Sequence, residues 1–316
     1  MSTATPDLRA GAFAYEQDDD WAKIPPGYEF PEAAGVAVDN NDNLFVFNRG
    51  PHPVMVFDKN GAFVRSFGEE TFTARAHGIH LSPDGFCYLI DDSQHAVHKF
   101  DMSGKLVWVL GEAGKPAPKW SGQPFNRPTH VGVSPKSGDI FVTDGYGNSR
   151  IHRYAPDGKH LLSWGDVGTE PGEFCNPHNV IVDEDDYVYV CDRENNRVQV
   201  FDNQGKLQTI WHDIYKADGM CRDKTGTFYI GELVGHHDTN TLGHRISIHA
   251  KDGTRLARLG SKVQGDGPGE FNAIHGCAVD SQNNLYLAEV SYTMRGRRED
   301  PPRTYKGLRR LKRVAS

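Results

Sequence analysis

One structural unit recurs six times along this chain of 316 residues, at a spacing of roughly 40–50 residues. Each copy contains an apolar strand, a polar turn, a second apolar strand and a third, and most are followed by a fourth, such as FVRSFG or LVWVLG. Four short strands per repeat are typical of β-propeller blades. The sequence therefore predicts an all-β fold, a six-bladed β-propeller with four antiparallel strands per blade, as one domain over residues 1–316. The copies begin at Gly35, Gly78, His130, Asn179, Gly219 and Gly276.

The sixth copy has only three recognisable strands. The segment GAFAYEQ, residues 11–17, lies at the other end of the sequence and reads as a short strand. We expect this N-terminal strand to supply the fourth strand of the last blade and to close the ring. Closure would leave no long sheet edge exposed to another chain.

Composition narrows the class of protein. The 35 basic and 42 acidic residues give a net charge of −7, which disfavours nucleic acid as a partner. The longest apolar runs have five residues, too few to span a membrane, and the N-terminus lacks the pattern of a secretory signal. The five cysteines are widely spaced without a CxxC pair, which is typical of reduced thiols. We therefore expect a cytoplasmic protein acting on a small molecule; its oligomeric state stays open.

A histidine pattern appears when the copies are aligned on their second strands. Copies two, four and six have histidine where the first strand begins, and copies one, three and five do not. Alternate blades are related by about a third of a turn, so three imidazoles should converge on the propeller axis. Three histidines with one open coordination position suit catalytic zinc, although another divalent transition metal, or water bound without metal, would also fit. The aligned positions are Ala34, His77, Thr129, His178, Asp218 and His275.

A second group belongs to the same face of the predicted ring. The turns after the second strands carry Arg49, Tyr146 and Arg193. A tyrosine beside a cation could act as a general base, and arginine offers a planar fork for a substrate carboxylate. His130, one residue beyond the aligned position, is a candidate substrate-binding group, with a fourth metal ligand or a histidine at the channel rim as alternatives. Structural roles also stay open, because Arg193 could pair with a neighbouring acid and Tyr146 could pack under a loop.

At these residues the chain resembles NHL-repeat propellers, and more closely the peptidylglycine α-hydroxyglycine amidating lyase family. The segments FNRPTHVGVSPKSGDIFVTDGYGNSRI and PGEFCNPHNVIVDEDDYVYVCDREN, within residues 125–205, carry this resemblance. It implies zinc held by His77, His178 and His275. It also leaves open a structural calcium ion held by backbone carbonyls in the channel.

The resemblance further implies that Arg49 and Tyr146 are essential and that Arg193 belongs to the site. Two positions depart from the family pattern: Gly147 replaces a disulfide-bonded cysteine, and Gly276 replaces an aspartate. No copper monooxygenase domain and no export signal are recognised in the sequence. We therefore expect a small molecule, and not a secreted peptide hormone, as the substrate.

These observations predict a metal-dependent lyase. It would cleave the C–N bond of an N-acyl-α-hydroxyglycine-like molecule to an amide and glyoxylate, with Tyr146 and Arg49 catalytic. One alternative is a zinc-dependent hydrolase or hydratase, lactonase-like, in the same channel. The other is a non-enzymatic NHL-repeat scaffold.

Overall fold

The computed structural model describes residues 8–235 and 242–315, which form six β-sheets with only three short helical segments. The predicted fold class is confirmed: the chain is an all-β, six-bladed β-propeller, with each sheet as one blade. Contacts divide it into two compact units, residues 68–217 and residues 1–67 with 218–316, and each unit contains three of the sheets.

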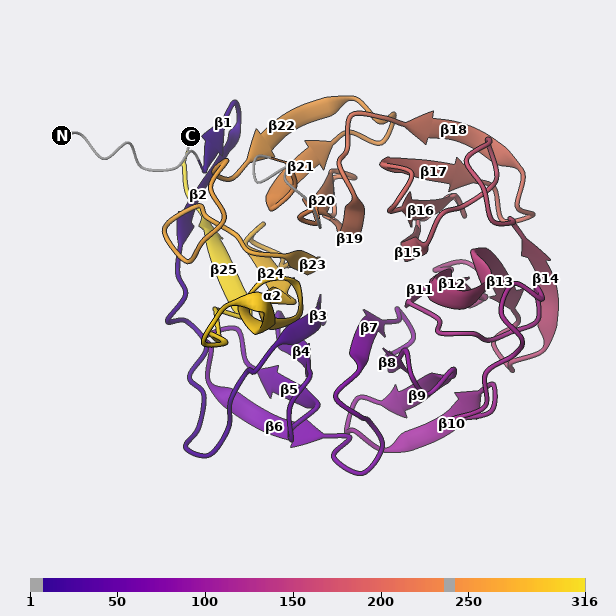
Figure 1. The fold of residues 1–316 in the computed structure, drawn as a ribbon, viewed down its shortest axis with the longest axis horizontal. Helices are drawn as coiled ribbons and strands as arrows, with labels where there is room; N and C mark the ends of the chain where they lie inside the picture. Colours follow the sequence, from indigo (N-terminus) through magenta and orange to yellow (C-terminus); the bar gives the residue numbers. More distant parts are fainter. Residues whose placement is uncertain (1–7, 236–241, 316) are drawn as a thin grey trace. The chain divides into compact units, whose positions relative to one another are not determined.

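The unit of residues 68–217 consists of three antiparallel sheets in which the strands follow chain order (Figure 1). The first strands of the three sheets lie side by side, and a single helical turn, α1 (Gly145–Asn148), follows the second strand of the middle sheet. The strands are β7 (Ala76–Leu81), β8 (Phe86–Asp91), β9 (Val97–Asp101) and β10 (Leu106–Leu110); β11 (His130–Val133), β12 (Ile140–Asp144), β13 (Arg150–Tyr154) and β14 (His160–Trp164); β15 (Pro177–Val182), β16 (Val188–Asp192), β17 (Arg197–Phe201) and β18 (Leu207–Trp211).

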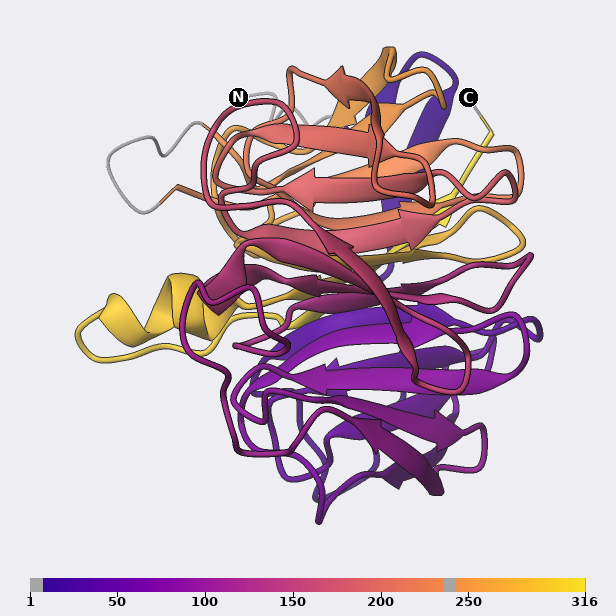
Figure 2. The ribbon, with the colours of Figure 1, turned by 90° about the vertical axis from the view of Figure 1, so that its right-hand side faces the viewer.

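The other unit also contains three sheets. Its helical segments α2 (Ser291–Met294) and η1 (Gly296–Arg298) lie beyond the ends of the strands of their own sheet (yellow in Figure 2). The strands are β3 (Ala33–Val38), β4 (Leu44–Asn48), β5 (Val54–Phe57) and β6 (Phe63–Phe67); β19 (Ala217–Arg222), β20 (Phe228–Glu232), β21 (Arg245–His249) and β22 (Arg255–Leu259); β23 (Ile274–Val279), β24 (Leu285–Glu289), β25 (Leu308–Arg313), β2 (Phe13–Gln17) and β1 (Arg9–Ala10).

The predicted closure by the N-terminal strand is confirmed. β2 pairs antiparallel with β25, and Tyr15 lies opposite Arg313. The last sheet therefore joins the two ends of the sequence. A two-residue strand, β1, adds a fifth member that the repeat pattern did not predict.

The turn after the third strand has a clear physical origin in three of the six repeats. Asp58 Oδ1 accepts the backbone N–H groups of Asn60 and Ala62, both at 2.8 Å, and Gly61 adopts a φ of +83° that a side chain would strain. The same turn recurs at Asp101 and Asp202. The sequence Asp-x-x-Gly, which begins at Asp58, Asp101 and Asp202, thus stops the third strand and reverses the chain.

Candidate metal centre and its surroundings

The three histidines of the sequence pattern share one local geometry. His77, His178 and His275 are each the second residue of the first strand of a sheet, β7, β15 or β23. At each of them the register shifts; on β7, for example, Ala76 lies opposite Asp91 and Gly78 lies opposite Ile90, so His77 is the extra residue of a β-bulge. Bulges redirect a side chain out of the regular alternation of a strand.

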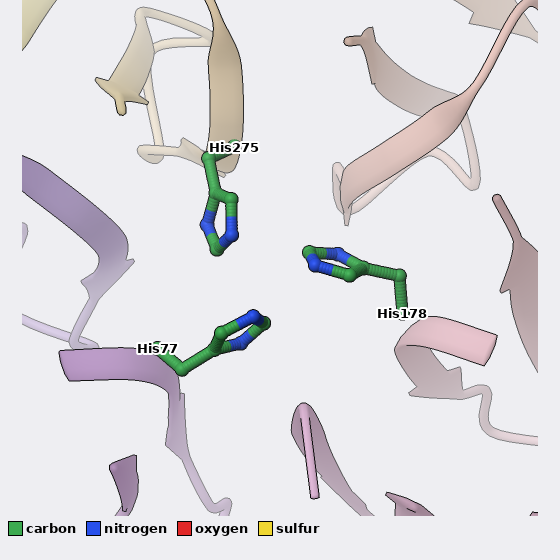
Figure 3. A group of neighbouring side chains, drawn as sticks. All are labelled: His77, His178 and His275. Atoms are coloured by element: carbon green, nitrogen blue, oxygen red, sulfur yellow. The ribbon is translucent and has the colours of Figure 1, made fainter. Parts of the chain in front are cut away.

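The bulges bring the imidazoles together. One candidate ligand atom from each of His77, His178 and His275 lies within 4.8 Å of the other two. The three residues are buried, with exposed fractions of 2%, 2% and 6%. Figure 3 shows the rings turned toward one another. This buried three-histidine group could hold a metal ion.

Hydrogen bonds to the backbone fix two of the rings. The Nδ1 atom of His77 lies 2.8 Å from the carbonyl oxygen of Thr129, and that of His275 lies 2.6 Å from the carbonyl oxygen of Ala34. A carbonyl can only accept, so each Nδ1 carries a proton, and in the neutral ring each Nε2 keeps a lone pair. This is the arrangement that orients metal-binding histidines, so the donor set fits a divalent transition metal.

Buried acids hold the segments that lead into these strands. The last residues of β8, β16 and β24 are Asp91, Asp192 and Glu289, and each is fully buried. Their carboxylates accept backbone N–H groups of Thr73 at 2.7 Å, Cys175 at 2.8 Å and Asn272 at 2.5 Å, respectively. Each donor precedes a histidine by three or four residues. The carboxylates therefore help to position the bulges that carry the histidines.

Tyr146 lies against two of the imidazoles. Its hydroxyl is 3.0 Å from Nε2 of His77 and 3.3 Å from Nε2 of His178. Within α1, the residue after Tyr146 has to be glycine. A Cβ on Gly147 would lie 2.2 Å from Oδ1 of Asn126. A cysteine could not occupy position 147 without displacing Asn126, which accounts for the first departure from the family pattern.

The second departure, Gly276, has a similar cause. A Cβ at this position would lie 3.0 Å from Cα of Gly35 and 3.2 Å from the carbonyl oxygen of Ala34, the group that holds His275. An aspartate there would require the backbone around Ala34 to move. Glycine at position 276 therefore permits the close packing of β23 against β3.

The predicted arginines have acidic partners. The guanidinium carbon of Arg193 lies 5.6 Å from the centre of the Tyr146 ring, and its Nε donates to Glu194 at 2.9 Å. In the other unit, Nη1 of Arg49 donates to Glu32 at 2.9 Å and to Thr293 at 3.2 Å, and the side chain is 8% exposed. Their roles toward a substrate stay predictions.

His130 begins β11 and packs near His80, with the ring centres 6.5 Å apart. Burial, and then the charge of His80, lowers the pKa of His130 to about 3, so its ring is neutral at neutral pH. Its Nδ1 is buried without a hydrogen-bond partner in the described part of the chain. Asp218, also in the aligned set, is fully buried on β19. No observation here assigns either residue to a substrate or a metal.

Sequence reasoning missed a charged cluster beside Tyr146. The carboxylate of Asp92, fully buried, accepts hydrogen bonds from both Arg75 and Arg127. The guanidinium carbon of Arg127 lies 4.5 Å from the centre of the Tyr146 ring. These residues come from three separate segments without a shared motif, and only the pair of successive acids at the end of β8, Asp91 and Asp92, marks the place in the sequence.

The remaining sequence expectations concern cysteines and membranes. The five cysteines are free in the structure. Among the described residues there is no helix with the length and apolar character needed to cross a bilayer.

Comparison with known proteins agrees with the fold. The NHL repeat model matches residues 125–154 and 174–201. A solved structure of streptogramin B lyase aligns with a TM-score of 0.63 at 13% identity, over 95% of this chain and 97% of that one. At this identity the match shows the fold alone. The chain is a six-bladed β-propeller that contains NHL repeats at residues 125–154 and 174–201.

Proteins similar in sequence give more specific information about the family than the match of the fold does. Peptidylglycine alpha-amidating monooxygenase of Rattus norvegicus is 33% identical over 230 residues, which cover 62% of this chain but only 23% of that protein. A probable peptidyl-alpha-hydroxyglycine alpha-amidating lyase of Caenorhabditis elegans is 32% identical over 216 residues, 59% of this chain and 60% of that protein. The propeller thus resembles the peptidyl-α-hydroxyglycine α-amidating lyases, as the sequence motifs indicated.

Proposed function

We propose that this chain is a metal-dependent lyase that cleaves the C–N bond of an N-acyl-α-hydroxyglycine-like small molecule, giving an amide and glyoxylate. The observation that supports this most is the contact of the Tyr146 hydroxyl with Nε2 of His77 and His178, because a phenol at this position could exchange a proton with a substrate held at the candidate metal centre. The name of one sequence relative, the probable peptidyl-alpha-hydroxyglycine alpha-amidating lyase of Caenorhabditis elegans, points to the same reaction class.

The donor set defines what could be bound. His77, His178 and His275 would hold the ion, with zinc or another divalent transition metal fitting three nitrogen ligands. When bound, such an ion acts as a Lewis acid and makes a hydroxyl group more acidic.

Residues of this chain would then transfer the proton of the substrate hydroxyl and stabilise the negative charge of the substrate. Tyr146, as phenolate, would take the proton of the substrate hydroxyl and return it to the amide nitrogen as the C–N bond breaks and the aldehyde forms. Arg193 and Arg49 would hold the substrate carboxylate and stabilise charge that develops on the aldehyde oxygen. The proton lost by the hydroxyl is gained by the amide, so no other reactant is needed.

The test is release of glyoxylate from α-hydroxyhippurate, together with the metal content of the purified protein. We expect glyoxylate and benzamide in equal amounts, loss of turnover in chelated protein, and recovery with added metal. The variant His178→Ala should lose both metal and activity. Full turnover by protein shown to be free of metal would contradict this proposal. Opening of lactones without glyoxylate release would instead indicate the hydrolase alternative.

A further inference from the structure

Two arginines share one buried carboxylate next to Tyr146. Nε and Nη2 of Arg75 donate to the two oxygens of Asp92 at 2.8 and 2.7 Å, and Nε of Arg127 donates to Oδ2 of Asp92 at 2.9 Å. The two guanidinium groups keep the pKa of Asp92 below its usual value although burial alone would raise it. The carboxylate is therefore ionised, and the three side chains together carry one surplus positive charge.

One arginine would be enough to neutralise Asp92. A second guanidinium on the same oxygen is repelled by the first, so the arrangement costs free energy unless another anion is present. The charge of nearby Asp91 also favours charged Arg75, but the carboxylate of Asp91 takes its hydrogen bonds from Thr73 and Ser93, which leaves the exposed N–H groups of the arginines for another anion. A surplus charge of this kind is a feature of anion-binding sites.

Both arginines also remain accessible. Their side chains are 41% exposed, whereas Asp92 is fully buried. A guanidinium has five N–H groups, and Asp92 takes two of them from each arginine. The rest can bind a carboxylate through the paired hydrogen bonds that this group prefers.

The arginine pair lies close to Tyr146, the residue proposed to transfer the proton. Arg127 lies over the ring of Tyr146, and the hydroxyl of Tyr146 contacts His77 and His178. The main chain strengthens this link, because the N–H of Tyr146 donates to the carbonyl of Arg127 at 3.3 Å. An anion bound by Arg127 would therefore lie next to the ring of Tyr146, whose hydroxyl contacts two of the candidate metal ligands.

We propose that Arg75 and Arg127 form an anion subsite for a second carboxylate, carried on the acyl group of the substrate. This inference rests on the proposed function for the identity of the molecule, and it deepens that function by naming the substrate class: N-acyl-α-hydroxyglycines in which a short acyl chain ends in a carboxylate. The carboxylate of the α-hydroxyglycine part of the substrate would be bound by Arg193 and Arg49.

Binding of unreactive analogues tests the subsite directly. N-succinylglycine and its neutral counterpart, in which the succinyl carboxyl is an amide, lack the hydroxyl and cannot be cleaved. We expect calorimetry on the purified protein to show about tenfold tighter binding of the acid, as for a hydrogen-bonded charged group. The preference should disappear in Arg75→Gln and in Arg127→Gln, because each variant leaves one arginine that is already engaged by Asp92.

The control variant is Lys105→Gln, which removes one exposed positive charge from the turn after β9, at the opposite end of the sheet from Asp91. It should keep the wild-type preference. Far-ultraviolet circular dichroism and the melting temperature check that each variant is folded, and in both arginine variants Asp92 retains one partner.

The outcomes separate this inference from the proposed reaction. Equal binding of the two analogues, no binding of either, or a preference that survives in both arginine variants would overturn the anion subsite. Turnover is measured separately with the α-hydroxy forms of the same two molecules. A charge preference in binding without glyoxylate release would refute the proposed lyase reaction and leave the subsite standing.

Discussion

Tyr146 is the residue on which the proposed chemistry depends most. Its hydroxyl contacts two imidazole nitrogens, and two guanidinium groups lie over its ring, at 4.5 and 5.6 Å from the centre. Tyr146→Phe removes the hydroxyl but keeps the ring and these contacts. If the hydroxyl transfers the substrate proton, kcat for glyoxylate release should fall by about 10²–10⁴. Steady-state kinetics with α-hydroxyhippurate measures this change.

The metal content of the same variant is the matched control. Tyr146→Phe leaves His77, His178 and His275 in place, so it should retain the metal content of the wild type. A variant that keeps its metal and its kcat would show that Tyr146 is not the proton-transfer group. Loss of metal together with activity would mean that the tyrosine serves the metal centre and not the reaction.

At the residue level, the sequence pattern could place the histidines but not explain their orientation. The spacing of His77, His178 and His275 within the repeats marks one position per blade. The bulge that turns each side chain depends on pairing with the next strand, which residue types alone do not specify. Arg127 was missed for a related reason: its φ of +58° and its contact with Asp92 depend on tertiary packing.

The strand β25, which pairs with β2 in the last sheet, carries the largest fully buried side chain of the described residues, Arg309. Arg309 donates to Glu289 at 2.7 Å and to Asp266 at 2.9 Å. Arg309→Met would leave Glu289 as a buried charge without its main partner. We expect this change to lower the free energy of unfolding by about 3–5 kcal/mol, measured by urea denaturation.

The next residue provides the control for that prediction. Arg310 lies on the same strand and pairs with Asp18 at 2.6 Å, but the side chain of Asp18 is 39% exposed. Arg310→Met should therefore cost only about 1 kcal/mol or less. Equal losses in the two variants would show that burial of the Arg309 cluster does not determine its contribution.

At the scale of the whole molecule, the repeats made the fold predictable, because each copy carries its own strand alternation and three copies share the Asp-x-x-Gly turn. Closure by residues 13–17 followed from a missing strand in the last copy. The strand β1 and the turns α1 and α2 were not predictable in the same way. They occur once each and are stabilised by contacts particular to their place, such as those around Gly147.

The stability of the folded chain should depend on pH through a buried histidine. Burial lowers the pKa of His80 to about 4, and its Nε2 is buried without a partner among the described residues. The unfolded chain, with a histidine pKa near 6.5, then binds the proton more tightly than the folded chain. Stability is therefore full above about pH 6.5 and falls as the pH decreases toward 4, by roughly 2 kcal/mol between pH 7 and pH 5 from this residue. Urea denaturation at the two pH values should show a smaller loss for His80→Gln than for the wild type, and an equal loss in both proteins would contradict the assignment.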